Sequence, residues 1–378
     1  MINYLIFNFG IINLNKMSEV RSDHLTVEND RVKGMICGIY LGDSLGVPHE
    51  FSYSNFIFTG KLEHQMIFRR NYGHPELKFA IGQASDDSEM SACLMNTIIE
   101  NNLKYIPSKA IINYMVWANS TSLIGKNTRK LFKNIKTLTG FISRYKKTFE
   151  FDITSVLGND LTKTITFSDF SKLNRTEKME SAQSNGSLMR NASLACLFDT
   201  SVVITDCLLT NPSLVAVDCC LVHVTMVRLA LFGYPREDIW NYIIQPGIIK
   251  TDIVKEALIQ AVNKTTRDMG KPSKGWVVHG IYVVFYVLYH NLTFEEAMTW
   301  IMSHTGSDTD TLACIAGSFL GALSGYEQLI SNEITRDNIN IMLKADLSNP
   351  EQTDIVRPDK YTFKHCLGLV DRLVEASI

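Results

Sequence analysis

The sequence predicts an all-α protein, folded as a compact orthogonal bundle of many helices. Apolar residues recur at helical spacing over 32–39, 90–97 and 312–323. The stretch 275–290 is rich in Val and Tyr, but its length and its single apolar stripe favour a helix over a strand. Short β-like runs, such as 202–204, are too few to build a sheet.

The length of the chain suggests two domains and leaves one large domain possible, behind an N-terminal appendage. The chain has 378 residues, 46% of them hydrophobic, and a formal net charge of -2, so neither nucleic acid nor a membrane is an expected partner. Residues 1–30 are expected to be an appendage, untranslated or disordered, with Met17 as an alternative start. Residues 31–378 are expected to form a single domain, in which the polar stretch 137–184 is a long connection or insertion over the surface.

The cysteines predict a reducing compartment. There are eight, without a CxxC pair, and most lie inside apolar runs, where a free thiol behaves as a small core side chain. We therefore expect a soluble intracellular protein, most simply a cytoplasmic one, with neither disulfides nor a zinc site. Uninterrupted apolar runs also stay below the ~18 residues that a membrane span needs.

Two short acidic clusters, 85–89 and 307–311, each lead into a predicted helix. Helix capping explains one Ser, Thr or Asp at such a place. It does not explain two carboxylates with neighbouring hydroxyls in each cluster, because clustered carboxylates repel unless a cation lies between them. Short, oxygen-only side chains favour Mg²⁺, with Mn²⁺ second. If the two helix N-termini converge, they form one binuclear metal site.

Glycines recur every fourth residue in two predicted helices, at Gly34, Gly38 and Gly42, and at positions 317, 321 and 325. Each row leaves a smooth stripe against which another helix can pack closely. After the first row, Pro48 turns the chain and delivers Glu50, which taken alone is a solvated loop carboxylate. The Asn-Gly sequence within 183–190 is either a common turn or a set of backbone N–H groups that can hold a phosphate.

Together, in this order, these elements resemble the ADP-ribosylglycohydrolase family, whose bacterial type member reactivates dinitrogenase reductase. The family's G-D-x-L-G-x-P-x-E-F opening is similar to 42–51, its T-D-D-T motif to 85–88, its N-G-x-x-M-R turn to 185–190 and its D-T-D-T motif to 308–311. A G-x-x-T turn is similar to 125–128, and the whole resemblance spans about 31–326. Ser85 and Ser88 stand where the family usually has Thr, and Asn211 stands where it often has His, so no His is carried over.

The resemblance implies an all-α enzyme with two Mg²⁺ ions, Mn²⁺ being the alternative. It assigns a catalytic carboxylate to Glu50 and a place against the substrate diphosphate to Asn185, Gly186 and Ser187. The implied metal ligands are Ser85, Asp86, Asp87, Asp308, Asp310 and Thr311.

The implied function is hydrolysis of the glycosidic bond between ADP-ribose and a protein side chain, the reversal of mono-ADP-ribosylation. Its partners are then an ADP-ribosylated protein as substrate and ADP-ribose as product. Two alternatives stay open: a non-catalytic relative that binds ADP-ribose or serves a structural role, and a hydrolase of small ADP-ribose conjugates or phosphate esters. The linkage and the target protein are left open as well.

Overall fold

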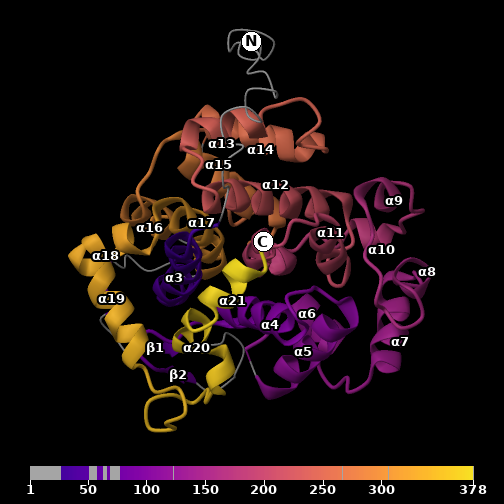
Figure 1. Cartoon of the computed structure of the whole chain (residues 1–378), viewed down its shortest axis with the longest axis horizontal. Helices are drawn as coiled ribbons and strands as arrows, with labels where there is room; N and C mark the ends of the chain where they lie inside the picture. The colour runs from indigo at the N-terminus through magenta and orange to yellow at the C-terminus, as the bar shows by residue number, and fades with distance from the viewer. Residues whose placement is uncertain are drawn as a thin grey trace.

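A computed structural model describes residues 27–50, 58–62, 66–68, 77–121, 123–265, 267–304 and 306–377. Helices dominate these residues, which confirms the all-α prediction (Figure 1). In the first half of the chain they are α3 (Asn29–Gly46), η1 (Val47–His49), α4 (Asp86–Glu100), α5 (Pro107–Ser120), α6 (Lys126–Phe132), α7 (Leu138–Phe149), α8 (Thr154–Leu157), α9 (Phe167–Ser171) and α10 (Glu177–Glu180). Next come η2 (Asn185–Ser187), η3 (Asn191–Cys196), α11 (Ser201–Leu208), α12 (Leu214–Leu231), α13 (Arg236–Ile243), α14 (Asp252–Val262) and α15 (Val277–Tyr289). The last are α16 (Phe294–Met302), α17 (Thr309–Ser324), α18 (Tyr326–Ser331), α19 (Glu333–Lys344), η4 (Asp359–Tyr361), α20 (Phe363–Leu367) and α21 (Val370–Glu375).

The helices α3 and α17, from opposite ends of the chain, pack backbone against backbone (Figure 1). A Cβ atom added to Gly38 would lie 1.9 Å from the carbonyl oxygen of Gly317, and one added to Gly34 would lie 2.3 Å from that of Gly321. The two glycine rows predicted from the sequence therefore face each other. Their pairing runs in opposite directions, so the end of α3 meets the beginning of α17. There the Thr309 hydroxyl donates to the carbonyl oxygen of Gly46 at 2.9 Å.

The two helices that carry the acidic clusters begin earlier than the apolar periodicity suggests. We expected them to start near residues 90 and 312, but α4 begins at Asp86 and α17 at Thr309. The acidic side chains thus occupy the first turns of these helices. The apolar pattern misses those turns because they consist mainly of acidic and hydroxyl side chains.

The polar segment 137–184, expected as a long connection or insertion over the surface, contains four helices. They are α7, α8, α9 and α10. Phe141, Tyr145 and Phe149 recur every fourth residue on α7 and are buried, and the Tyr145 hydroxyl donates to the carbonyl oxygen of Leu208 at 2.9 Å. Three aromatic side chains on one stripe are enough to attach a helix whose other faces are polar.

One short β-hairpin interrupts the helical architecture between α3 and α4. It pairs β1 (Met66–Phe68) with β2 (Leu77–Phe79) in antiparallel register, with Met66 opposite Phe79. The sequence pattern does not predict this hairpin, because strands of three residues carry too little periodicity to be recognised. At the N-terminal boundary, residues 1–26 lie outside the described part, whereas Val27 is buried and α3 already begins at Asn29.

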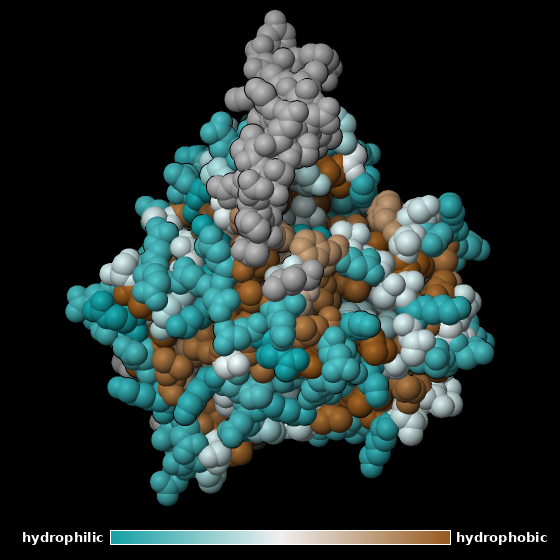
Figure 2. Space-filling model, in the orientation of Figure 1, coloured by the Kyte–Doolittle hydropathy of each residue, from teal (hydrophilic) through white to brown (hydrophobic). Residues whose placement is uncertain are grey.

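The helix α12 is long and apolar enough to cross a membrane by length and composition, and it is the one such helix among the described residues. Most of it is buried inside the protein, where it packs against α11, α15 and α17, as expected for a core helix. On the face in Figure 2, hydrophilic side chains predominate and apolar ones lie in small groups between them. Across the described residues, all eight cysteine thiols are buried.

Candidate metal centre and active site

Asp43, on the last turn of α3, holds the beginning of α4. Its fully buried carboxylate accepts the backbone N–H groups of Ser85, at 3.0 Å, and Ser88, at 2.9 Å, and the Ser88 hydroxyl at 2.6 Å. Ser85, the N-cap residue of α4, makes no side-chain capping bond of its own. Burial raises the pKa of the Asp43 carboxyl, while the hydrogen bonds from Ser88 and Ser85 oppose that shift. The capping of α4 is therefore supplied by another helix.

A first group of carboxylates joins three helices. Oxygens of Asp43, Asp87 and Asp310 all lie within 4.8 Å of one another, and all three residues are buried. The Oδ2 of Asp87 accepts the Ser85 hydroxyl at 3.0 Å, whereas its buried Oδ1 has no hydrogen-bond partner. Burial, followed by the neighbouring carboxylates, raises the pKa of Asp87 and of Asp310 well above the ordinary range. A cation between these groups would offset both the repulsion and the unpaired oxygen.

A second group shares Asp310 with the first. Oxygens of Glu50, Asp308 and Asp310 lie within 4.8 Å of one another. The side-chain amide of Asn185 donates to Oδ2 of Asp308 at 2.8 Å, and the Thr311 hydroxyl donates to its Oδ1 at 3.3 Å. Asp308 is the N-cap residue of α17 but makes no capping bond, so helix capping does not account for this cluster either.

Glu50 is half-buried at the end of η1, beside this second group. Burial raises the pKa of its carboxyl well above the ordinary range, and Asp308 and Asp86 add to that effect, while Lys274 lowers it. Lys274 also lowers the pKa of the Asp308 carboxyl. Sequence reasoning missed this lysine, since nothing in the pattern of 264–276 relates it to the acidic clusters.

Asp86 belongs to neither group of close oxygens. Its Oδ2 accepts the backbone N–H of Gly125 at 2.9 Å, which joins the start of α4 to the turn before α6. Burial raises its pKa to about 6; the bond from Gly125 lowers the pKa, while Asp43 and Asp308 raise it. Asp86 is therefore electrostatically part of the same site.

The Asn-Gly turn, η2, lies against the second group. Besides the bond to Asp308, the Asn185 backbone N–H donates to the carbonyl oxygen of Gly275 at 2.9 Å. The Ser187 hydroxyl is fully buried and contacts the thiols of Cys207 and Cys220, so its side chain faces the core. Any contact of Ser187 with a ligand would come from its backbone.

Buried polar side chains support this turn from below. Arg190 donates to the carbonyl oxygen of Gly186 at 2.9 Å and pairs with Asp206 at 2.8 Å, with both side chains inside the core. Asn211 donates to the carbonyl oxygen of Ser184 at 3.0 Å. Asn211, which stands where the family often has His, thus fixes the backbone just before η2.

Of the six residues expected as metal ligands, Asp87, Asp308 and Asp310 lie in the two carboxylate groups, and Glu50 lies in the second group with Asp308 and Asp310. The hydroxyls of Ser85 and Thr311 donate to Asp87 and Asp308, whereas Asp86 lies outside both groups. Sequence reasoning missed Asp43, although it lies within the Gly-rich motif 42–51; an aspartate on an otherwise apolar helix was the available signal. Oxygen-only donors around an orphaned buried carboxylate oxygen fit a hard divalent cation.

The fold and the site define an all-α enzyme with a carboxylate-lined centre suited to divalent cations. The sequence profile of the ADP-ribosylglycohydrolase family matches residues 24–345. The chain belongs to this family and is a glycosyl hydrolase, as the resemblance implied. The family is generally metal-dependent, in keeping with the two groups of carboxylates.

Two relatives and one solved structure illustrate the similarity. A protein of Acanthamoeba polyphaga mimivirus, with the provisional name ADP-ribosyl glycohydrolase, is 23% identical over 78% of this chain and 86% of its own length. An ADP-ribosylarginine hydrolase of Pseudomonas putida is 24% identical over 78% of this chain and 71% of its own. A solved ADP-ribosylglycohydrolase-related protein complex contains a chain of the same fold, with a TM-score of 0.58 and 17% identity over 93% of this chain and 99% of that one.

Proposed function

We propose that the protein is a Mg²⁺-dependent hydrolase that removes ADP-ribose from a protein side chain. One observation carries the proposal: two groups of carboxylate oxygens share Asp310, and Oδ1 of Asp87 is buried without a hydrogen-bond partner. Family membership supports an ADP-ribosyl substrate. Asp310 is then the residue common to two cation sites.

The proposed ligands divide between the two helix starts. Ser85, Asp86 and Asp87 come from α4, and Asp308, Asp310 and Thr311 come from α17. Asp43 lies within reach, but its oxygens already accept hydrogen bonds from α4, so we assign it the task of holding Asp87 in place. Bound divalent ions would supply polarisation of a water molecule and of the ribose hydroxyls.

Glu50 is the proposed proton-transfer residue. Its carboxyl group lies next to Asp308 and Asp310, at the edge of the site and not in the core, where a substrate can reach it. In hydrolysis the bond at the anomeric carbon breaks, a water oxygen takes the place of the leaving side-chain atom, and that atom takes up a proton. Glu50 can give that proton or accept the one that the water loses.

Asn185, Gly186 and Ser187 are proposed to lie against the diphosphate. The turn is held at a fixed distance from the carboxylates by the bond between Asn185 and Asp308. Backbone N–H groups are well suited to bind phosphate oxygens without adding charge to the site.

ADP-ribosylarginine is the first conjugate to test, because the relative from Pseudomonas putida carries that substrate in its name. The protein is incubated with ADP-ribosylated arginine and serine peptides, with Mg²⁺ and then with EDTA, and products are identified by mass spectrometry. Release of intact ADP-ribose only with Mg²⁺ is the expected result. Absence of release from every peptide would refute the proposal, and cleavage within the diphosphate would assign a different reaction.

The cellular setting of this reaction stays a prediction. We propose an intracellular location, as expected from the cysteines, and an ADP-ribosylated protein as the partner.

A further inference from the structure

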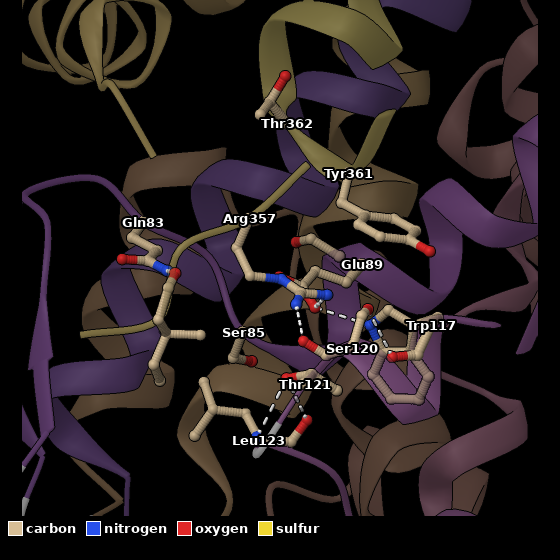
Figure 3. A network of polar contacts seen from close by, with 12 residues as sticks. Gln83, Ser85, Glu89, Trp117, Ser120, Thr121, Leu123, Arg357, Tyr361 and Thr362 are labelled. Carbon is tan, nitrogen blue, oxygen red and sulfur yellow. Dashed lines mark hydrogen bonds and ion pairs between the residues drawn. The ribbon is translucent and has the colours of Figure 1, made fainter. Parts of the chain in front are cut away.

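Arg357 is a buried arginine in the segment between α19 and η4, beyond the residues 24–345 that match the family. Its side chain is only 1% exposed. The guanidinium donates to both carboxylate oxygens of Glu89, from Nε at 2.6 Å and from Nη2 at 2.8 Å (Figure 3). Its Nη1 donates to the carbonyl oxygen of Ser120, at the end of α5, at 2.8 Å.

Glu89 lies on the first turn of α4, two residues after Asp87. Its backbone N–H donates to the carbonyl oxygen of Ser85 at 3.3 Å, and its carboxylate also accepts the indole N–H of Trp117 at 2.7 Å. Figure 3 shows Arg357 and Trp117 converging on Glu89 from two different segments. The turn that carries Asp86 and Asp87 is thus held by Asp43 on one side and by this network on the other.

The segment that carries Arg357 is itself attached to the chain that leads into α4. The side-chain amide of Gln83 donates to the carbonyl oxygen of Ile355 at 2.9 Å. The backbone N–H of Asp354 donates to the carbonyl oxygen of Lys78, on β2, at 2.8 Å. Arg357 therefore does not reach Glu89 from a loose tail, because its neighbours are fixed to the residues just before Ser85.

A buried ion pair is an expensive way to gain stability, because both charges lose their hydration. Its geometric effect is clearer, since a planar guanidinium with two parallel bonds permits one orientation of a carboxylate. A carboxylate fixed in this way also fixes the rotation of the helical turn to which it belongs.

We propose that Arg357 is a positioning residue for the metal centre, which sets the rotation of the first turn of α4 through Glu89 and thereby the placement of Asp86 and Asp87. This inference rests on the divalent metal centre of the proposed function. On this proposal, the C-terminal segment, which lies outside the family match, contributes to the geometry of the site.

The test is the affinity of the metal-free full chain for Mn²⁺, measured by calorimetry and by the EPR signal of free Mn²⁺. The variants are Arg357→Met, Arg357→Lys and the double variant Glu89→Gln/Arg357→Met. The double variant removes both charges of a neutral pair, so it leaves the net charge near the centre unchanged. The single Met variant leaves Glu89 either charged or protonated, and neither form repels a cation.

Arg236→Met serves as the matched control. Arg236 donates to the carbonyl oxygens of Val287 and Leu292, at 2.9 and 2.6 Å, around the far end of α15. Its loss removes comparable arginine–backbone bonds at a place away from α4. Circular dichroism and a thermal melt on each variant establish which of them are folded at the temperature of the titration.

We expect Mn²⁺ affinity to fall by about 10- to 100-fold in Arg357→Met and in the double variant, by less in Arg357→Lys, and not at all in Arg236→Met. If Arg357→Met does not fold, the Mn²⁺ affinities of the double variant and of Arg357→Lys test the role of Arg357. A folded double variant with affinity within about twofold of the wild type would overturn the role of Arg357 while leaving the metal centre intact. A wild-type protein that binds no Mn²⁺ would overturn the metal centre itself, and this role with it.

Discussion

Substitution of Gly38 by Ala tests the backbone contact on which the whole site depends. The added Cβ atom would lie 1.9 Å from the carbonyl oxygen and 2.5 Å from the carbonyl carbon of Gly317. An ordinary contact begins at 3.4 Å, so α3 and α17 would have to open by about 1.5 Å at this point. Neither side can yield by changing a rotamer, because both contacting atoms belong to the backbone.

Overpacking of this kind costs about 1–3 kcal/mol, and a backbone obstacle places Gly38→Ala at the upper end. Ala gains up to about 1 kcal/mol of helix propensity over Gly, which offsets part of the loss. We therefore expect a net decrease of about 2 kcal/mol in the free energy of unfolding. Because Asp43 follows on the same helix and faces Asp310, the same opening should also weaken Mn²⁺ binding.

The assay is urea unfolding followed by tryptophan fluorescence, together with a Mn²⁺ titration. Gly140→Ala is the control, because Gly140 lies in α7 and the nearest atoms to its added Cβ are side-chain atoms, at 3.2 and 3.4 Å. There the gain in helix propensity opposes a mild side-chain crowding, so the free energy of unfolding should stay within about 1 kcal/mol of the wild type. If Gly38→Ala proves as stable as Gly140→Ala and binds Mn²⁺ normally, the close approach of α3 and α17 is wrong.

Three further predictions concern the site and the core. Asp87→Asn should weaken Mn²⁺ affinity by about 10- to 100-fold. It should also raise the melting temperature of the metal-free protein, because a buried carboxylate with an unpaired oxygen is removed. Calorimetry and a thermal melt measure the two effects, and an unchanged Mn²⁺ affinity would contradict the role of Asp87 as a metal ligand. Glu50→Gln should lower single-turnover release of ADP-ribose by about 10²- to 10⁴-fold at saturating Mn²⁺, so normal turnover would remove Glu50 from the mechanism. His223 is buried against Asn191 and Ser318, and burial lowers its pKa to about 4. Since the unfolded chain protonates near pH 6.5 and the folded one only near pH 4, stability should fall by up to about 3 kcal/mol as pH drops through that window. Urea unfolding between pH 7 and 4 checks this, and a wild-type slope that equals that of His223→Gln would refute it.

The part of the site that sequence could predict is the part encoded in local patterns. The glycine rows at every fourth residue indicated a close helix pair, and α3 and α17 do meet along those rows. The two acidic clusters carried more carboxylates than capping needs, and the structure brings Asp87 and Asp310 together.

What sequence could not predict depends on distant partners. In the sequence, Asp43 is a single acidic residue on an apolar helix. Its role in holding the start of α4 is known only from the structure, in which Ser85 and Ser88 donate hydrogen bonds to it. Glu89 and Arg357 are 268 residues apart, and neither lies in a pattern that selects the other. Pairings of this kind are determined by the packed fold, so they cannot be predicted from the local periodicity of the sequence.

The antiparallel meeting of α3 and α17 also has a consequence for synthesis. Gly46 and Thr309, which touch at this junction, are separated by 263 residues. During translation, Asp43, Asp86 and Asp87 leave the ribosome long before the aspartates that complete their surroundings. The two groups of carboxylates that share Asp310 can therefore form only after the ribosome has released residues beyond 310, long after Asp43, Asp86 and Asp87 have emerged.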